Sequence, residues 1–207
     1  MNRRVFGATL VAAAAISLLA VPSVQAEPKV GAPAPSFTAV DSNGKTVNLG
    51  DFKGKTVVLE WTNDGCPYVR KHYGSGNMQA LQKKWTGQGI VWLSVISSPP
   101  GEQGFADAAR ANALTTDRKA APSAVLLDPK QQVAKSYGAL VTPHMYIITP
   151  EGTLAYAGAI DDKPTARTGD LKGATNYVDN ALSELKSGKP VSTPTSRAYG
   201  CVVKYSS

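Results

Sequence analysis

The sequence predicts an α/β fold, in which a largely buried sheet is covered by helices. Two nearly continuous apolar runs, 56–61 and 90–96, have the composition of strands that are covered on both faces. Helical patterns alternate with these runs, and the clearest is 174–185, where apolar residues recur at the spacing of one helix face. Strands and helices that alternate in this way are typical of the α/β class.

The fold is predicted to begin with a β-hairpin. The runs 36–40 and 45–49 alternate apolar and polar residues and flank Asn43-Gly44, a pair typical of tight hairpin turns. The strand at 56–61 follows, and a helix begins at Pro67. Gly74-Ser75-Gly76 interrupts this helix, so we expect a kink or a break there.

The second half of the chain supplies the remaining elements. Asp128 is predicted to cap a helix that has Pro129 in its first turn and stops at Gly138. Gly188 and Pro190 end the last helix. The other expected elements are, in order, a strand at 90–96, a short helix at 105–114, a strand at 123–127, and a second hairpin formed by 145–149 and 154–158.

The first 26 residues have the pattern of a signal peptide and are not counted as part of the fold. Arg3 and Arg4 precede an apolar run at 5–21, and Val24-Gln25-Ala26 offers small residues for cleavage. We therefore expect an exported protein, in the periplasm. The apolar run is short against the roughly 20 residues of a membrane span, so a retained membrane anchor is the alternative. Arg3-Arg4 also weakly resembles a twin-arginine signal, with the general secretory route as the default.

The rest of the chain has the length of one domain, 27–190, followed by a tail at 191–207. Its charge does not indicate a nucleic-acid partner. The full sequence has 22 Lys and Arg against 15 Asp and Glu, a net charge of +7. This excess is spread thinly without a block of like charge, as on a solvated basic surface, whereas nucleic-acid binding needs clustered positive charge. No membrane contact is expected after the signal peptide is removed.

Cys66 is the residue that says most about chemistry. A strand, a polar turn and then Cys66-Pro67 form the layout of a thiol delivered to the first turn of a helix. Pro67 suits the first helical position, where its missing N–H costs nothing. The positive end of the helix dipole favours a thiolate and lowers the pKa of the thiol, so we expect Cys66 to be a nucleophile.

The ordered motifs along the chain resemble a known family. Cys66-Pro67-Tyr68-Val69, the segment 136–143 and the hairpin at Gly152 are similar to the thioredoxin fold, and more narrowly to exported, peroxiredoxin-like redoxins related to the AhpC/TSA proteins. The resemblance covers essentially all of 27–207. It implies a central mixed sheet flanked by helices and thiol chemistry at Cys66. A protein disulfide or a peroxide would be the substrate, an external thiol the reductant, and no cofactor or metal would take part.

Two departures from the family pattern limit what carries over. The second cysteine of a thioredoxin pair would fall at Val69, so that pair is absent. A peroxiredoxin would have threonine three residues before its cysteine and a proline further upstream, where this chain has Asn63 and Leu59. Thr62 lies four residues before the cysteine. With this peroxide-binding triad incomplete, efficient peroxidase activity is not expected.

The resemblance implies a role for Pro143 and suggests one for its neighbour. Pro143 matches a cis-proline that faces the thiol and exposes the backbone of residue 142 for strand-like pairing with a substrate peptide; a trans proline that merely starts a strand is the alternative. His144 either tunes the pKa of Cys66 and shuttles a proton, or lies partly exposed on a strand edge. His72 is read as solvated.

Cys201 has three possible roles, and two functions follow from them. It resolves a disulfide or sulfenate formed at Cys66, or it forms a static disulfide that pins the tail, or it is unpaired. The first role makes the protein a thiol–disulfide oxidoreductase or a weak thiol peroxidase. The second allows a redox-inert thioredoxin-fold binding module with a structural Cys66–Cys201 bond.

Overall fold

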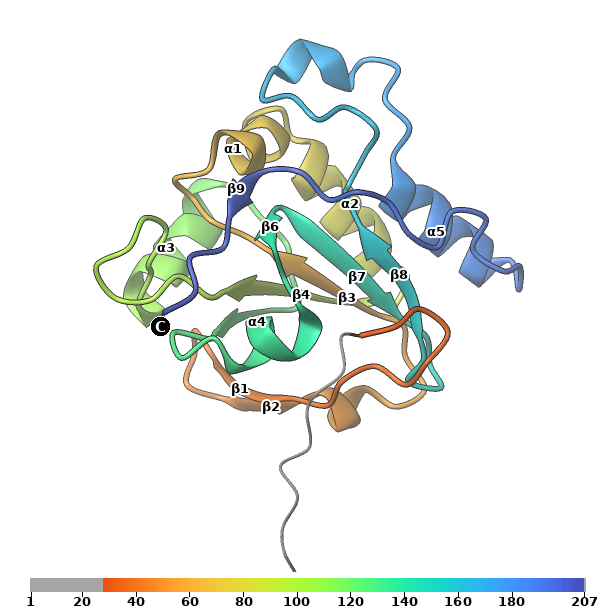
Figure 1. Cartoon of the computed structure of the whole chain (residues 1–207), viewed down its shortest axis with the longest axis horizontal. Coiled ribbons are helices and arrows are strands. Elements are labelled where there is room, and N and C mark those ends of the chain that lie inside the picture. The colour runs from red at the N-terminus through yellow and green to blue at the C-terminus, as the bar shows by residue number, and fades with distance from the viewer. Residues whose placement is uncertain (1–27, 207) are drawn as a thin grey trace, which may run out of the picture.

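A seven-stranded mixed sheet forms the centre of the protein, in the order β2-β1-β5-β4-β3-β7-β8 (Figure 1). The computed structural model describes residues 28–206, so the predicted signal peptide at 1–26 lies outside the described residues. Strands β3, β4 and β5 are parallel to one another, and the remaining pairs are antiparallel. The strands are β1 (Thr38–Asp41), β2 (Thr46–Asn48), β3 (Val57–Trp61), β4 (Val91–Ile96), β5 (Ala124–Leu127), β7 (His144–Ile148) and β8 (Leu154–Gly158).

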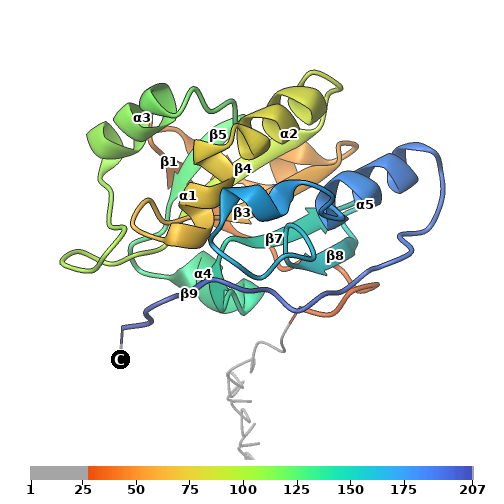
Figure 2. The same ribbon diagram turned by 90° about the horizontal axis from the view of Figure 1, so that it is seen from above.

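Helices cover both faces of this sheet, as predicted (Figure 2). One face carries α1 (Pro67–Gly74), α2 (Asn77–Thr86), α3 (Ala108–Asp117) and α5 (Tyr177–Lys186). The other carries α4 (Gln132–Tyr137), and the buried side chains Ala39 of β1 and Val47 of β2 belong to the same core cluster as this helix. Side chains alternate between the two layers, so Val58 of β3 packs under α1 and α2 while Val57 and Leu59 pack toward α4. No helix among residues 28–206 is long and apolar enough to cross a membrane.

Most local predictions are confirmed. Strands β1 and β2 pair antiparallel around Asn43-Gly44, and β7 and β8 form the second hairpin. Gly76 is the N-cap residue of α2 and has a left-handed φ of 78°. This backbone conformation separates α1 from α2. Helix α3 begins at Ala108 rather than 105, because the Asp107 side chain accepts a hydrogen bond from the backbone N–H of Arg110 and fixes the start there.

The predicted start of α4 is wrong. Asp128 and Pro129 lie in a turn, closed by a hydrogen bond from Gln131 N–H to the Asp128 carbonyl at 2.8 Å. The residue before the helix is Gln131, with a left-handed φ of 59°. The Asp128 carboxylate still satisfies the helix start, since it accepts from Val133 N at 3.2 Å and Ala134 N at 2.9 Å. Asp128 therefore caps the helix as predicted in chemistry, but it lies three residues before the N-cap residue, Gln131.

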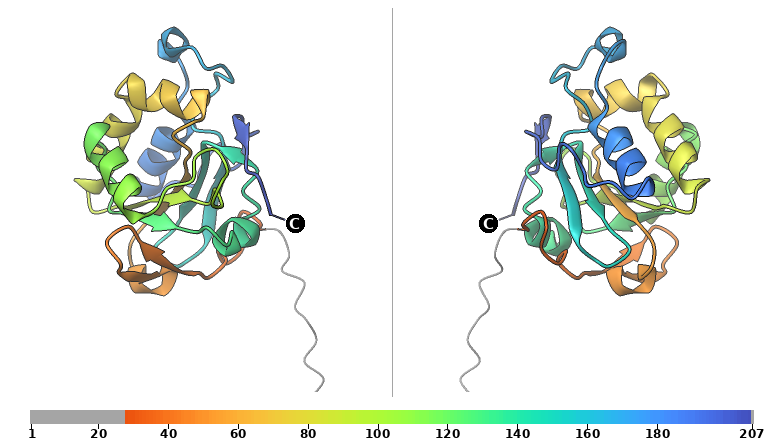
Figure 3. Two further views of the ribbon diagram at one scale, coloured as in Figure 1. Left: turned by 90° about the vertical axis from the view of Figure 1, so that its left-hand side faces the viewer. Right: turned by 90° about the vertical axis from the view of Figure 1, so that its right-hand side faces the viewer.

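The C-terminal tail folds back across the sheet and forms a short strand before its end (Figure 3). It first follows the edge of β8, where Ala157 N–H donates to the Pro194 carbonyl at 3.2 Å. It then forms β9 (Cys201–Val202), which pairs antiparallel with the short strand β6 (Val141–Thr142). The sequence did not predict this second sheet, which brings Cys201 to the start of α1.

Candidate active site

Cys66 lies at the N-terminus of α1, beyond the carboxyl end of β3. It is the residue that caps the helix, with Pro67 in the first turn, as the sequence predicted. Its side chain is fully buried, among residues that include Val69 and Met145. The free backbone amides of the first helical turn face this position, so the site suits a negative charge on sulfur.

The structure brings the two cysteines together. Cys201 lies opposite Thr142 in the β6–β9 pair, and the Cys66 thiol donates to the Thr142 carbonyl at 3.1 Å. A hydrogen bond also joins the side chains of Cys66 and Cys201, both of which are free thiols. The peptide bond between Thr142 and Pro143 is cis, as the resemblance implied. The tail strand therefore occupies the pairing position that was expected for a substrate peptide.

The pKa values of the two thiols are shifted in opposite directions. Burial alone would raise the pKa of Cys66, but the side chain of Cys201 and the groups able to donate to a thiolate, the Thr142 hydroxyl and the backbone at Val69, outweigh it and lower that pKa. Burial, the hydrogen bond to Cys66 and the negative charge on Cys66 together raise the pKa of Cys201 to about 12. Cys66 is therefore the more acidic thiol of the pair, and Cys201 the less acidic one.

Thr142 is poised to stabilise that thiolate. Its hydroxyl is buried and, among the described residues, has no hydrogen-bond partner while Cys66 is a thiol. A buried hydroxyl without a partner is costly, so donation to the Cys66 thiolate would relieve the cost. The residue next to the cis-proline thus supplies both a carbonyl that accepts from the thiol and a hydroxyl that suits the thiolate.

His144 lies on the other side of the sheet from the thiol. Its ring packs against Tyr146 with centroids 4.5 Å apart, whereas Cys66 packs with Met145, whose side chain points to the opposite face. Burial lowers the pKa of His144 to about 4, so the ring is neutral at pH 7. Its Nδ1 accepts a hydrogen bond from Leu140 N–H at 3.3 Å, and this contact ties the ring to the segment that leads into β6.

The solvated reading of His72 is wrong. This side chain is fully buried in α1, and burial lowers its pKa to about 4. It lies 3.8 Å from Asp161, which also forms an ion pair with buried Lys71 at 3.7 Å. The Tyr199 hydroxyl donates to Asp161 and accepts from Lys71, so this buried charge cluster anchors the tail two residues before Cys201. Asp161 and Tyr199 are distant in sequence, which is why the helix pattern alone did not place His72 inside.

Glu60 is a buried acid that the sequence reasoning passed over. It interrupts the apolar run of β3 and is fully buried. Burial raises its pKa, against the effect of four hydrogen bonds donated to it. These come from Tyr73, Gln82, Trp92 and Ser94. A charged residue inside an apolar strand was the available signal, and its satisfied network ties β3 to α1, α2 and β4.

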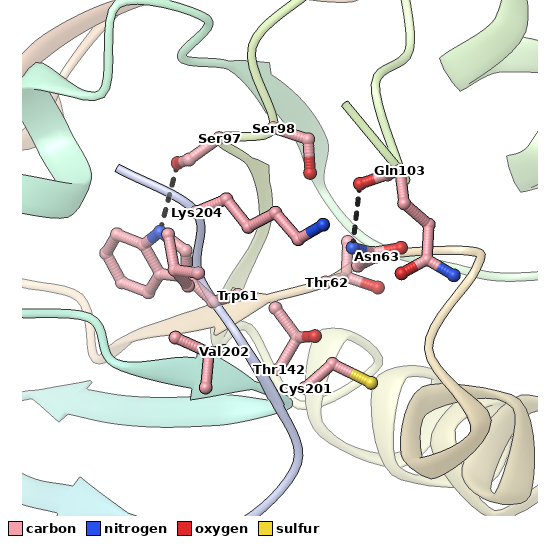
Figure 4. A pocket seen from close by; sticks show the side chains of 11 residues that line it. Trp61, Thr62, Asn63, Ser97, Ser98, Gln103, Thr142, Cys201, Val202 and Lys204 are labelled. Carbon is pink, nitrogen blue, oxygen red and sulfur yellow. Dashed lines mark hydrogen bonds between the residues drawn. The ribbon is translucent and has the colours of Figure 1, made fainter. Parts of the chain in front are cut away.

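A small pocket opens beside Cys201 (Figure 4). Its volume is about 110 Å³, and Cys201 lines it whereas Cys66 does not. The side chains around it are mainly polar, and they include Asn63, Ser97, Ser98, Gln103, Thr142 and Lys204. The described residues contain no group of three or more His, Cys, Asp or Glu side chains arranged for a metal ion. The site therefore offers a pair of thiols and a polar approach to one of them.

Comparisons with known proteins identify the family of the chain. Residues 30–157 match the model of the AhpC/TSA family. Thiol-disulfide oxidoreductase ResA of Bacillus subtilis (strain 168) is 30% identical over 122 residues, which are 59% of this chain and 63% of ResA. The chain thus spans less than two thirds of that relative.

Solved structures show the same fold over most of the chain. A hypothetical protein, SMc02350 from Sinorhizobium meliloti 1021, superposes with a TM-score of 0.75 and 25% identity, covering 86% of this chain and 96% of its own. An uncharacterized conserved protein from Geobacillus kaustophilus gives a TM-score of 0.74 at 24% identity and covers 91% of this chain and 98% of its own. A thiol:disulfide interchange protein from Bacteroides sp. shares the fold at a TM-score of 0.54 and 23% identity, over 78% of this chain and 95% of its own.

Proposed function

The chain belongs to the AhpC/TSA family, and from this premise we propose that it is an exported thiol–disulfide oxidoreductase with Cys66 and Cys201 as its redox pair. The observation that carries the proposal is the contact between two thiols of opposite acidity beside the cis-proline. The similarity to ResA supports the reaction type. The signal-peptide pattern at 1–26 supports export to the periplasm. We propose 27–190 as the domain and 191–207 as its redox-active tail.

The first step is attack by the Cys66 thiolate on one sulfur of a substrate disulfide. A mixed disulfide forms between Cys66 and that sulfur, and the other substrate sulfur leaves as a thiolate that takes up a proton. Since Cys66 is buried and β9 occupies the edge of β6, a protein disulfide reaches it only when the tail moves aside. Pro143 keeps the Thr142 backbone next to the reacting sulfur, and His144 holds the Leu140 backbone that leads into β6.

The second step makes Cys201 the attacking group. Once Cys66 is bound in a mixed disulfide, it no longer carries the negative charge or accepts the hydrogen bond that raise the pKa of Cys201. Cys201 then loses its proton more easily and attacks the Cys66 sulfur, releasing the substrate as a thiolate. The Cys66–Cys201 disulfide that remains is reduced by two equivalents of an external thiol, which together supply two electrons per cycle and leave as a disulfide.

Replacing Cys201 tests this cycle. In Cys201→Ser, reduced Cys66 should still attack, but mixed disulfides with glutathione should accumulate and turnover should fall at least about tenfold, because the intramolecular thiol is lost. Val202→Ser is the matched control, since it changes the neighbouring β9 residue, which is 70% exposed, without removing a sulfur. Mass spectrometry of the adducts and a disulfide-reduction assay give the two readouts. Unchanged turnover in Cys201→Ser would mean that Cys201 does not resolve the disulfide.

A second candidate function is a redox-inert binding module in which Cys66–Cys201 is a static bond. The anchoring of the tail beyond Cys201 favours it. The Gln131 side chain donates to the Lys204 carbonyl at 2.6 Å and accepts from Ser206 N–H at 2.8 Å. A drop in melting temperature in Cys201→Ser, with no disulfide-reduction turnover in either this variant or the wild type, would support this alternative.

Weak thiol peroxidase activity is the remaining alternative within the family. The Asn63 side chain at the threonine position is already engaged, since it accepts from Gly65 N–H at 2.8 Å and donates to the Gln103 carbonyl at 3.0 Å. These contacts support an assignment to disulfide exchange over efficient peroxide reduction. Peroxide consumption by the reduced protein, compared with its disulfide-reduction rate, separates the two.

A further inference from the structure

We propose that a small external thiol reduces the Cys66–Cys201 disulfide by attacking the sulfur of Cys201, which it reaches through the polar pocket, and that Cys66 is the leaving group. This inference rests on the proposed function and adds a direction to it. It assigns the outward-facing role to the tail cysteine, and it gives the pocket a ligand class, a low-molecular-mass thiol.

Access to the two sulfurs is unequal. Cys66 is 0% exposed and does not line the pocket, because α1 and β9 enclose it. Cys201 is only partly buried, and its side chain borders the pocket (Figure 4). A thiol that approaches while β9 remains paired with β6 therefore meets the Cys201 sulfur first.

The size and lining of the pocket fit a small polar thiol. Its volume of about 110 Å³ is below the range of roughly 300–1,000 Å³ typical of sites for drug-sized ligands, so it admits the thiol end of a molecule such as glutathione and not the whole tripeptide. Asn63, Gln103, Ser97 and Ser98 offer hydrogen-bonding side chains around it. Lys204 also lines it and forms an exposed ion pair with Glu102 at 3.3 Å. Exposed ion pairs are weak, so an incoming thiolate can compete with Glu102 for the ammonium group.

The chemistry favours the same sulfur. The incoming thiolate forms a bond to the Cys201 sulfur as the Cys66–Cys201 bond breaks, and Cys66 departs as a thiolate. A second thiol then attacks the added sulfur, releases the oxidised small-molecule disulfide and leaves Cys201, which takes a proton. Two thiols lose two electrons in total and the protein disulfide gains them.

Attack on the Cys66 sulfur is less favourable, both in the acidity of the leaving group and in access. Attack on Cys66 would expel Cys201, whose pKa is raised next to a negative Cys66, whereas Cys66 has a lowered pKa and a neighbouring Thr142 hydroxyl. Thiols of lower pKa leave faster in disulfide exchange. Attack on Cys66 would also require the tail to move before the thiol arrives.

Adduct mapping tests which sulfur is attacked. The oxidised mature protein, with its Cys66–Cys201 bond first verified by non-reducing peptide mapping, is mixed with glutathione, quenched with N-ethylmaleimide after short intervals, and mapped again. We expect glutathione on Cys201 and maleimide on Cys66, in at least about tenfold excess over the reverse pattern. Glutathione on Cys66, or equal labelling of both, would overturn the proposal. Failure to form the disulfide at all would overturn the proposed function with it, so the two failures are distinguishable.

A charge variant tests the route. Lys204→Gln should slow reduction by glutathione about threefold, because the positive charge at the pocket is lost. Lys189→Gln is the control, since it removes the same charge from an exposed position that does not line the pocket. Equal rates for the two variants would exclude the pocket as the route.

Discussion

At the scale of single residues, the chemistry of the site depends on the hydrogen bond between the Cys66 and Cys201 side chains and on which of the two thiols loses its proton first. Cys66 has the helix N-terminus, the Thr142 hydroxyl and Cys201 to stabilise its negative charge, against the cost of burial. Cys201 has no comparable support, and its pKa is raised to about 12. The difference assigns the roles of the two residues within the proposed cycle, in which Cys66 ionises first.

Removing the proton that Cys201 donates should raise the pKa of Cys66. In reduced wild-type protein, alkylation by iodoacetamide should increase with pH around a midpoint below the ordinary thiol value of about 8.5. Cys201→Ala removes the donor and should move this midpoint to higher pH. Cys201→Ser keeps a hydroxyl donor and should move it less, so the two variants form a matched pair. A wild-type midpoint at or above the ordinary value would contradict the assignment of Cys66 as the thiolate.

At the scale of elements, local patterns were informative and distant pairings were not. The strand before Cys66, the helix start at Pro67 and the break at Gly76 follow from residues that are adjacent in sequence, and all three were predicted. The pairing of β6 with β9 involves two residues on each strand and joins segments far apart in the chain. Strands this short show no periodic pattern from which the pairing could be predicted. The thiol at the helix start was therefore predictable, whereas its contact with Cys201 was not.

Buried charge was hidden for the same reason. The place of His72 in α1 suggests exposure, but the ring is buried with Asn77 at Nδ1 and with Asp161 and Tyr199, which come from later parts of the chain, near Nε2. His144 follows the cis-proline, as the resemblance suggested, but the alternation of β7 turns its ring to the α4 side. Sequence proximity to a functional residue therefore did not determine which face a side chain takes.

Gly200 is the element-level test of the tail strand. Its φ of 143° is one that only glycine adopts readily, and an added Cβ would lie 1.9 Å from the Thr142 carbonyl oxygen. Gly200→Ala should therefore push β9 off β6 and raise the rate at which a bulky maleimide labels Cys66 by about tenfold or more. Gly173→Ala is the control, since Gly173 also has a positive φ, of 76°, but its added Cβ would meet nothing within 4 Å. Equal labelling of the two variants would show that the tail strand does not shield Cys66.

At the scale of the whole molecule, the tail spans the fold from β8 to α4 and closes the site (Figure 3). The anchors on Asp161 and Gln131 hold it on either side of Cys201. Such a tail serves a static bond and a reversible one equally well in geometry. Only the energetics of the Cys66–Cys201 disulfide separates the oxidoreductase from the binding module.

The reduction potential of the Cys66–Cys201 pair tests the central claim most directly. The mature protein is equilibrated in glutathione and dithiothreitol redox buffers, and the fraction of disulfide is measured by quenched thiol labelling and mass. We predict one reversible two-electron transition between about −300 and −120 mV, the range of catalytic thiol–disulfide proteins. A potential below about −300 mV, where structural disulfides lie, or the absence of any Cys66–Cys201 bond would contradict the account.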